Sequence, residues 1–221
     1  DGFLPDGSAM YISRADHPEN TPPTDRRDLW ISRRSSTGGW QQAKNMGRPI
    51  NNGGQNFLVT AMPDGNTLYL QNTYSEDGSS AGQGMSVSTR DGDRWSLPRT
   101  VQIEDYYNLS ASVVSYVAPN GRVMIMSIQR RDTRGELDMY VCFRNSDGSW
   151  SAPKNMGDVL NTVGSDMGPF IAADDRTLVF ASNSHPGYGG YDLFVSRRLD
   201  DTWLSWSTPE NLGPTINGDE H

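Results

Sequence analysis

Carboxylates are the side chains in this sequence whose placement could support catalysis. Glycoside hydrolysis needs two carboxyl groups roughly 5–10 Å apart, one of them with a raised pKa. The candidates are Asp105, Asp166, Asp219 and Glu220. The position of Asp166 within the repeat described below holds Asn56 in one copy and Ser112 in another, which weakens a shared catalytic role. Carbohydrate cleavage, or lectin-like glycan binding, is therefore the alternative function, and cleavage requires two of these carboxylates to meet in one pocket.

Thiol and metal chemistry have little support in the sequence. Cys142 is the one cysteine, so an intrachain disulfide and a thiolate metal cluster are both excluded. Cys142 occupies a repeat position that holds serine in the other copies, and we interpret it as a small packing residue. The three histidines, His17, His185 and His221, show no metal-ligand spacing, and no calcium-loop spacing occurs. We predict no cofactor and no metal.

Four tryptophans reveal an internal repeat. Trp40, Trp95, Trp150 and Trp206 are spaced 55, 55 and 56 residues apart, and they open the phrases WQQAKNMG, WSLPRTVQ, WSAPKNMG and WSTPENLG. A turn phrase such as PDGNTLYL and a strand phrase such as DLWISRR recur at nearly the same interval. Several independent phrases in one order indicate four copies of a unit of about 55 residues.

Each copy is predicted to form four short strands. In the second copy these are about 56–62, 66–72 and 84–90, with a last strand around Trp95. Apolar and polar residues alternate at the period of a pleated sheet, and no segment keeps a helical period. Four-stranded units of this length, arrayed radially, are propeller blades. The large tryptophan of each last strand suits packing between blades.

The sequence therefore predicts an all-β fold, a β-propeller of four-stranded antiparallel blades. We expect a single domain over residues 1–221, with repeats at about 1–55, 56–110, 111–165 and 166–221. The four copies could close a ring, or they could be an excised part of a longer protein with further blades.

Composition agrees with such a fold and limits the partners. The 23 glycines and 13 prolines suit many turns and short strands. The formal net charge of −8 repels phosphate backbones, so we predict no nucleic-acid partner. No apolar run approaches the length of a membrane span, so we predict no direct membrane insertion of this segment.

The fourth copy carries the clearest family resemblance. It reads DDRTLVFASNSHPGYGGYDLFVSRR and then WSTPENLGPTIN. These phrases resemble the WD40-like Pro-Asp β-propeller repeat of bacterial envelope proteins, a family that includes the TolB propeller and OmpA-family-associated propellers of Bacteroidetes. The second copy departs from the pattern, with Gly84 where the others have Asp and TVQIEDYYN where a Gly-x-x-Ile-Asn phrase is expected.

This resemblance implies a periplasmic or outer-membrane-associated protein that binds other proteins and has no catalytic residues. On that basis we predict a non-catalytic scaffold rather than an enzyme. It would present one propeller face to another envelope protein or to an extended peptide.

The predicted binding face lies where the loops between second and third strands meet the connections between copies. These loops span roughly 13–27, 72–83, 128–137 and 183–191. The face is predicted to gather Asn56, Asp105, Tyr106, Tyr107, Asp166 and Tyr188. The first of these loops is the longest and rich in proline, and it is either a rigid arm for a partner or an insertion.

Three aspartates precede the third strand of their copies, namely Asp28, Asp138 and Asp192. A metal or catalytic role is conceivable for such a recurring carboxylate. Because each recurs with the repeat, we favour a structural role, in which the carboxylate caps a turn or accepts a backbone N–H.

Overall fold

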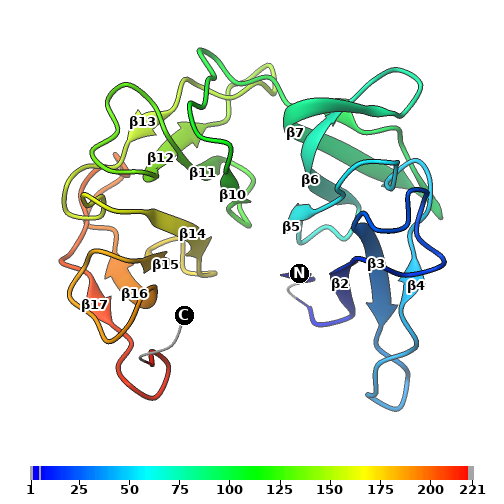
Figure 1. Cartoon of the computed structure of the whole chain (residues 1–221), viewed down its shortest axis with the longest axis horizontal. Helices are drawn as coiled ribbons and strands as arrows, with labels where there is room; N and C mark the ends of the chain where they lie inside the picture. Colours follow the sequence, from blue (N-terminus) through cyan, green and yellow to red (C-terminus); the bar gives the residue numbers. More distant parts are fainter. Residues whose placement is uncertain (1, 5, 219–221) are drawn as a thin grey trace. The chain divides into compact units, whose positions relative to one another are not determined.

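The computed structural model describes residues 2–4 and 6–218. The chain divides into two compact units, Asp1–Val101 and Gln102–His221 (Figure 1). Each unit contains two antiparallel sheets, and the described residues contain no helix. These findings confirm the predicted all-β fold of four-stranded propeller blades. The assignment of residues 1–221 to a single domain stays a prediction.

The strands of each sheet follow one another in chain order, as in a propeller blade. The first sheet contains β1 (Gly2–Phe3), β2 (Ala9–Arg14), β3 (Asp28–Arg33) and β4 (Lys44–Asn45). The second contains β5 (Leu58–Ala61), β6 (Thr67–Tyr74), β7 (Ser80–Asp91) and β8 (Arg94–Trp95), with β9 (Arg99–Thr100) also paired to β7. The third contains β10 (Val114–Val117), β11 (Val123–Ile128), β12 (Asp138–Phe143) and β13 (Lys154–Asn155). The fourth contains β14 (Asp166–Ile171), β15 (Thr177–Ser182), β16 (Asp192–Arg197) and β17 (Glu210–Asn211).

The hairpin of β6 and β7 is longer than predicted. Most of the predicted loop 72–83 is strand, because β6 continues to Tyr74 and β7 begins at Ser80. Within this extension Gly84 has a φ of +139°, and a Cβ there would lie 2.7 Å from Thr73 Cγ2. The close approach requires glycine, which explains why the second copy lacks the aspartate found in the other three.

The turns between first and second strands are closed by short polar side chains. Asp64 accepts hydrogen bonds from the backbone N–H groups of Asn66 and Thr67, at 2.8 and 2.9 Å. Asp174 does the same for Arg176 and Thr177. A further bond from the Thr177 hydroxyl, together with these backbone bonds, lowers the pKa of Asp174 to about 2.

At the opposite edge of the first sheet, buried polar side chains form a chain of hydrogen bonds. Asn45 donates its Nδ2 to Asp28 Oδ2 at 2.8 Å, and Asn51 donates its Nδ2 to Asn45 Oδ1 at 2.9 Å. The Asn51 side chain also forms two hydrogen bonds with the backbone of Leu29. Its Oδ1 accepts from the Leu29 N–H at 2.8 Å, and its Nδ2 donates to the Leu29 carbonyl at 2.9 Å. We call this arrangement the Asp–Asn–Asn relay.

The relay recurs in the third and fourth sheets with nearly the same distances. Its members are Asp138, Asn155 and Asn161 around Met139, and Asp192, Asn211 and Asn217 around Leu193. Each aspartate also accepts a backbone N–H from the preceding loop, donated by Thr21, Arg134 and Tyr188 respectively. In the second sheet the corresponding positions hold Gly84, Thr100 and Tyr106, so all three relay residues are replaced together.

In each unit the two sheets pack face to face through apolar side chains. In the first unit these include Tyr11, Leu29, Ile50, Leu68 and Leu70. In the second unit they include Ile125, Met139, Val141, Met156, Leu160, Ile171, Leu178, Phe180, Phe194 and Trp206. Figure 1 shows β14 beside β10 in this unit. Removal of this apolar surface from water stabilises each pair of sheets.

The four repeat tryptophans differ in burial. Trp150 and Trp206 are buried, Trp95 is half-buried, and Trp40 is 39% exposed. The guanidinium carbon of Arg34 lies 5.0 Å from the centre of the Trp40 ring. The guanidinium carbon of Arg90 lies 5.5 Å from the centre of the Trp95 ring. Two of the tryptophans therefore lie against an arginine of their own sheet, and Trp95 also packs against the apolar core of the first unit.

Candidate functional site

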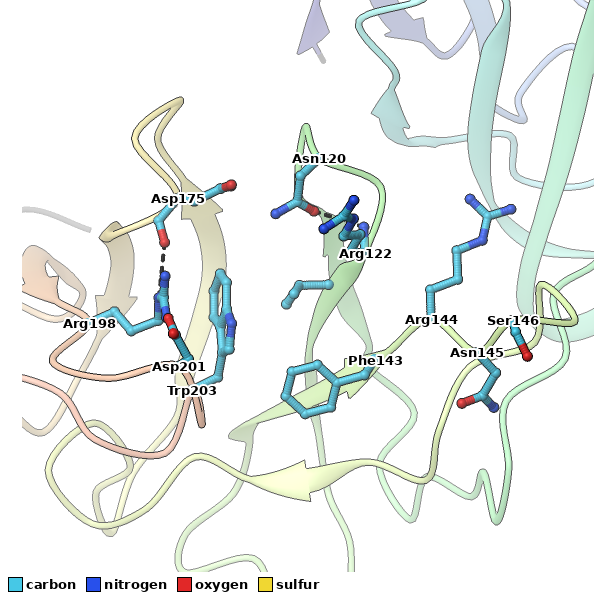
Figure 2. Close-up of a pocket in the computed structure, with 11 residues that line it drawn as sticks. Asn120, Arg122, Phe143, Arg144, Asn145, Ser146, Asp175, Arg198, Asp201 and Trp203 are labelled. Atoms are coloured by element: carbon cyan, nitrogen blue, oxygen red, sulfur yellow. Dashed lines mark hydrogen bonds and ion pairs between the residues drawn. The ribbon is translucent and has the colours of Figure 1, made fainter.

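A cleft of about 710 Å³ lies in the second unit, between the third and fourth sheets (Figure 2). It is lined by Asn120, Arg122, Val123, Phe143, Arg144, Asn145, Ser146, Asp175, Arg198, Asp201 and Trp203. These residues come from the turns between first and second strands and from the hairpins between third and last strands. We call it the turn-edge cleft. It lies at the edge of the sheets opposite the predicted binding face.

Trp203 forms one wall of this cleft because the fourth hairpin is longer than its counterpart in the third sheet. Seven residues separate the bridged pair Arg198 and Trp206, whereas five separate Arg144 and Trp150. Trp203 has a φ of +64°, and its carbonyl accepts a bond from Trp206 Nε1 at 2.9 Å. A bulky residue in this left-handed region is strained, and such strain often marks positions that function maintains.

The side chain of Arg198 contacts Trp203 and holds it in place. Its guanidinium lies 4.6 Å from the centre of the Trp203 ring and forms a 2.7 Å ion pair with Asp201 Oδ1. Its Nε also donates to the carbonyl of Asp175 at 3.0 Å. This arginine is therefore already neutralised within the cleft.

Two other arginines of the cleft are uncommitted, by which we mean that their guanidinium groups have no partner among the described residues. Within residues 2–4 and 6–218, the guanidinium groups of Arg122 and Arg144 have no hydrogen-bond or ion-pair partner. The two residues are neighbours, since the N–H of Arg144 donates to the carbonyl of Arg122 at 2.9 Å. Figure 2 shows the Arg122 side chain beside Asn120, whereas the Arg144 side chain extends away from Phe143. Such an arrangement favours a carboxylate or another anion.

A second cleft, of about 400 Å³, lies at the other edge of the same two sheets. It is lined by Ser110, Ser112, Gln129, Glu136, Leu137, Ser165, Met167 and Tyr191. The one charged side chain of this lining, Glu136, accepts a hydrogen bond from the Ser165 hydroxyl at 2.9 Å. This cleft belongs to the edge where the binding face was predicted, but none of the six predicted face residues lines it.

Two of those predicted residues, Asn56 and Asp166, are buried. Asn56 donates its Nδ2 to Asp28 Oδ1 at 3.1 Å. Asp166 accepts bonds from the N–H and the hydroxyl of Thr162, at 2.5 and 2.9 Å, and burial raises its pKa above 3.8. The Asn56 side chain therefore joins two sheets, whereas the Asp166 side chain holds the connection that precedes its own strand.

The other predicted residues occupy two separate segments. Asp105 and Tyr107 are held by Arg130, which forms a 2.9 Å ion pair with Asp105 and lies 4.0 Å from the Tyr107 ring centre. Tyr106 is half-buried, and Tyr188 is exposed on the loop before β16. A role of these residues in binding stays a prediction. Sequence reasoning missed Arg130, although its place between a buried strand and a polar loop was a possible signal.

The two clefts described above contain none of the candidate catalytic carboxylates among their lining residues. Asp105 and Asp166 line neither of the two clefts. Asp219 and Glu220 lie outside the described residues.

Cys142 is buried, and burial raises the pKa of its thiol to about 12. The thiol is therefore protonated at neutral pH. In the described ranges, no group of three or more His, Cys, Asp or Glu side chains could hold a metal ion. Those same residues include no helix of the length and apolarity needed to span a membrane.

Comparison with known proteins supports the fold. No protein-family model matches the chain, and no curated protein matches it significantly. An α-L-arabinofuranosidase from Lactobacillus brevis is 14% identical, with a TM-score of 0.51 over 91% of this chain and 70% of that one. A puromycin hydrolase mutant complexed with PGG is 12% identical, with a TM-score of 0.51 over 96% of this chain. TolB from Acinetobacter baumannii is 14% identical, with a TM-score of 0.48 over 88% of this chain.

The chain spans only 39% of the TolB chain and 28% of the puromycin hydrolase chain. At these identities the similarity shows the fold alone. The absence of a family match leaves membership of the Pro-Asp repeat family a prediction.

The comparisons correct one expectation. We predicted from the family resemblance that the chain is not an enzyme. That prediction is wrong, because the fold does not exclude catalysis. Proteins described as a hydrolase and an arabinofuranosidase have similar structures. A propeller scaffold can carry catalytic as well as binding sites.

Proposed function

We propose that the chain is a partner-binding propeller whose turn-edge cleft binds an acidic segment of another protein. The observation that carries this proposal is that Arg122 and Arg144, whose guanidinium groups have no partner among the described residues, line one cleft with the aromatic side chains of Phe143 and Trp203. A guanidinium binds a carboxylate through two parallel N–H···O bonds. The aromatic groups can cover apolar parts of the same ligand.

The balance of charge in the cleft supports an anionic ligand. The lining contains three arginines and two aspartates, in a chain whose formal net charge is −8. Since Arg198 is paired with Asp201, two arginines are left against Asp175. We expect the acidic group of the ligand on the Arg122 side, away from Asp175.

We place this binding in a bacterial envelope, in the periplasm or at the outer membrane, on the strength of the Pro-Asp repeat phrases. The partner in this proposal is another envelope protein, recognised through an extended acidic peptide.

The test is the binding of fluorescently labelled peptides, measured by anisotropy. One peptide alternates glutamate with leucine or phenylalanine, and the matched peptide has glutamine in place of each glutamate. We expect the acidic peptide to bind and its affinity to fall with added salt. The double substitution Arg122→Gln and Arg144→Gln should lower the affinity by about tenfold or more, because charge-assisted hydrogen bonds are lost.

Arg34→Gln is the matched control for this experiment. Arg34 is bridged to Trp40 in the first sheet as Arg144 is to Trp150 in the third, and it lies outside the cleft. Equal binding of the two peptides would refute the proposal. An equal loss of affinity in the Arg34 variant would do the same.

The structural similarity to hydrolases calls for a parallel assay with arabinofuranosides and short peptides. Cleavage that disappears on Asp105→Asn or Asp166→Asn would assign the activity to these carboxylates instead of the turn-edge cleft.

A further inference from the structure

The second cleft, of about 400 Å³, is lined mainly by polar side chains that the proposed function does not use. We call it the hydroxyl cleft, after the three serines and the tyrosine that line it together with Gln129, Glu136, Leu137 and Met167. All of these lining residues belong to the second unit, so the cleft is defined within one compact body. Its volume lies in the range of about 300–1,000 Å³ that is typical of small-molecule sites.

One side of the hydroxyl cleft is fixed by Asn108. The Oδ1 of Asn108 accepts hydrogen bonds from the backbone N–H groups of Ser110 and Gln129, at 3.1 and 2.9 Å. Its Nδ2 donates to the carbonyl of Ser112 at 2.8 Å. Because these bonds use the backbone of the lining residues, the Gln129 amide and the Ser112 hydroxyl keep their own hydrogen-bonding capacity. Neither side chain has a partner among the described residues.

The other side is fixed where the loop before β12 meets the connection before β14. The N–H of Glu136 donates to the carbonyl of Gly164 at 2.9 Å. A Cβ on Gly135 would lie 2.2 Å from the Gly164 oxygen, so this approach of two backbones requires glycine. The hydroxyl of Ser165, a residue that is 3% exposed, donates to Glu136 Oε2 at 2.9 Å. The Glu136 carboxylate is therefore held by one oxygen, and its Oε1 has no partner in the described part of the chain.

The groups that remain available suit a neutral ligand rich in hydroxyls. The described lining residues include no arginine or lysine, so an anion would meet the charge of Glu136 without a counter-ion. The Gln129 amide both donates and accepts, and Glu136 Oε1 accepts, which matches the neighbouring hydroxyls of a sugar. Tyr191, which is 41% exposed, and Met167 provide apolar surface for the C–H groups of a sugar ring.

We propose that the hydroxyl cleft binds a neutral mono- or disaccharide without cleaving it. Glu136 Oε1 accepts a hydrogen bond from one sugar hydroxyl, the Gln129 amide bonds to neighbouring hydroxyls, and Tyr191 packs against the ring. Glycoside hydrolysis in most enzymes needs two carboxyl groups roughly 5–10 Å apart. Glu136 is the one carboxylate among the described lining residues, so the cleft has a binding group but no catalytic pair.

The test is a ligand-observed NMR titration of the full chain with the methyl glycosides of glucose, galactose and mannose, and with cellobiose and maltose. We expect at least one of these sugars to bind with a dissociation constant of about 10 mM or lower. The matching uronic acid, which has a carboxylate in place of the hydroxymethyl group, should bind at least about tenfold more weakly because Glu136 repels it.

Glu136→Gln and Gln129→Ala should each weaken binding of the neutral sugar by about tenfold, because each removes hydrogen bonds to it. Glu136→Gln should also reduce the discrimination against the uronic acid, which a loss of structure alone would not do. Glu76→Gln is the matched control, since Glu76 is an exposed glutamate of the first unit, and it should change nothing. Circular dichroism checks that all three variants fold.

The absence of binding by every sugar of the panel would overturn the proposal, as would binding that survives both substitutions. Binding of putrescine in place of the sugars, lost in Glu136→Gln, would assign the cleft to a cationic ligand instead. Release of free glucose from a bound disaccharide would refute binding without cleavage. The double variant of Arg122 and Arg144 should bind the sugar normally, so failure of the peptide-binding proposal is distinguishable from failure of this one.

Discussion

Asp166 and Asn56 hold equivalent positions in two sheets but offer opposite hydrogen-bonding chemistry. The backbone N–H of each donates, at 2.8 Å, to the carbonyl of the residue before the relay aspartate, Asp138 or Asp28. Asn56 then donates its side chain to Asp28 Oδ1. An ionised Asp166 cannot donate, and Oδ1 of both Asp138 and Asp166 is buried without a partner in the described part of the chain. The second unit therefore has two buried acceptors, one in the third sheet and one in the fourth, where the first unit has a hydrogen bond.

Asp166→Asn should stabilise the protein at neutral pH by about 1–2 kcal/mol, because it supplies the missing donor. Burial is the main cause of the raised pKa of Asp166, and hydrogen bonds from Ser182 and Thr162 oppose it. A folded pKa above 3.8 means that the parent is most stable at lower pH and loses stability as pH rises through that folded pKa. The advantage of the variant should therefore grow over the same pH window. Urea denaturation at a series of pH values measures it.

Asn56→Asp is the reciprocal control. It should destabilise the protein at neutral pH and do less harm in acid, since protonation restores a donor. A stability gain in Asp166→Asn that is the same at every pH, or a loss at neutral pH, would contradict this account.

At the residue scale, the sequence predicted the structural role of the recurring aspartates from their place before each third strand. It wrongly suggested surface positions for Asn56 and Asp166. Whether a residue at or just before the start of a strand is buried depends on the neighbouring sheet, and the pattern within one copy does not contain that information.

At the scale of elements, the Asp–Asn–Asn relay fastens the last strand and the following connection to the third strand. Asn155 lies at its centre, donating to Asp138 at 2.8 Å and accepting from Asn161 at 2.9 Å and from the N–H of Gly157 at 2.9 Å. We expect Asn155→Ala to lower the free energy of unfolding by about 2–4 kcal/mol, because it leaves buried polar groups without partners.

The second sheet supplies the control for that experiment. Thr100 holds the position equivalent to Asn155 and is exposed, so Thr100→Ala should change the stability by less than about 0.5 kcal/mol. Chemical denaturation of the two variants against the parent measures both effects. Equal losses would show that the relay adds nothing beyond the strand pairing itself.

The strand order and the turns were predictable because alternation and Pro-Asp-Gly phrases are local signals. The extended β6–β7 hairpin and the cleft wall at Trp203 were not. The first depends on cross-strand pairing between loop residues, and the second on two extra residues whose path is set by packing under Arg198. Neither leaves a periodic trace in the sequence.

At the scale of the whole molecule, the formal net charge of −8 opposes polyanions. The uncommitted arginines of the turn-edge cleft suit a short acidic segment, but a long phosphate backbone would also meet the acidic remainder of the surface. We therefore expect no binding of double-stranded DNA at physiological salt, measured by anisotropy with a labelled duplex. Tight, salt-sensitive DNA binding would contradict this prediction.

The two edges of these sheets have different freedom to change during evolution. The relay constrains the edge where the sheets are joined, so substitutions there cost stability. The hairpins at the opposite edge are largely exposed, and their lengths already differ between copies, with seven residues enclosed in the fourth and five in the third. New ligand preferences could therefore arise by lengthening one hairpin while the frame is inherited unchanged, and a hairpin exchanged between copies should carry its binding surface with it.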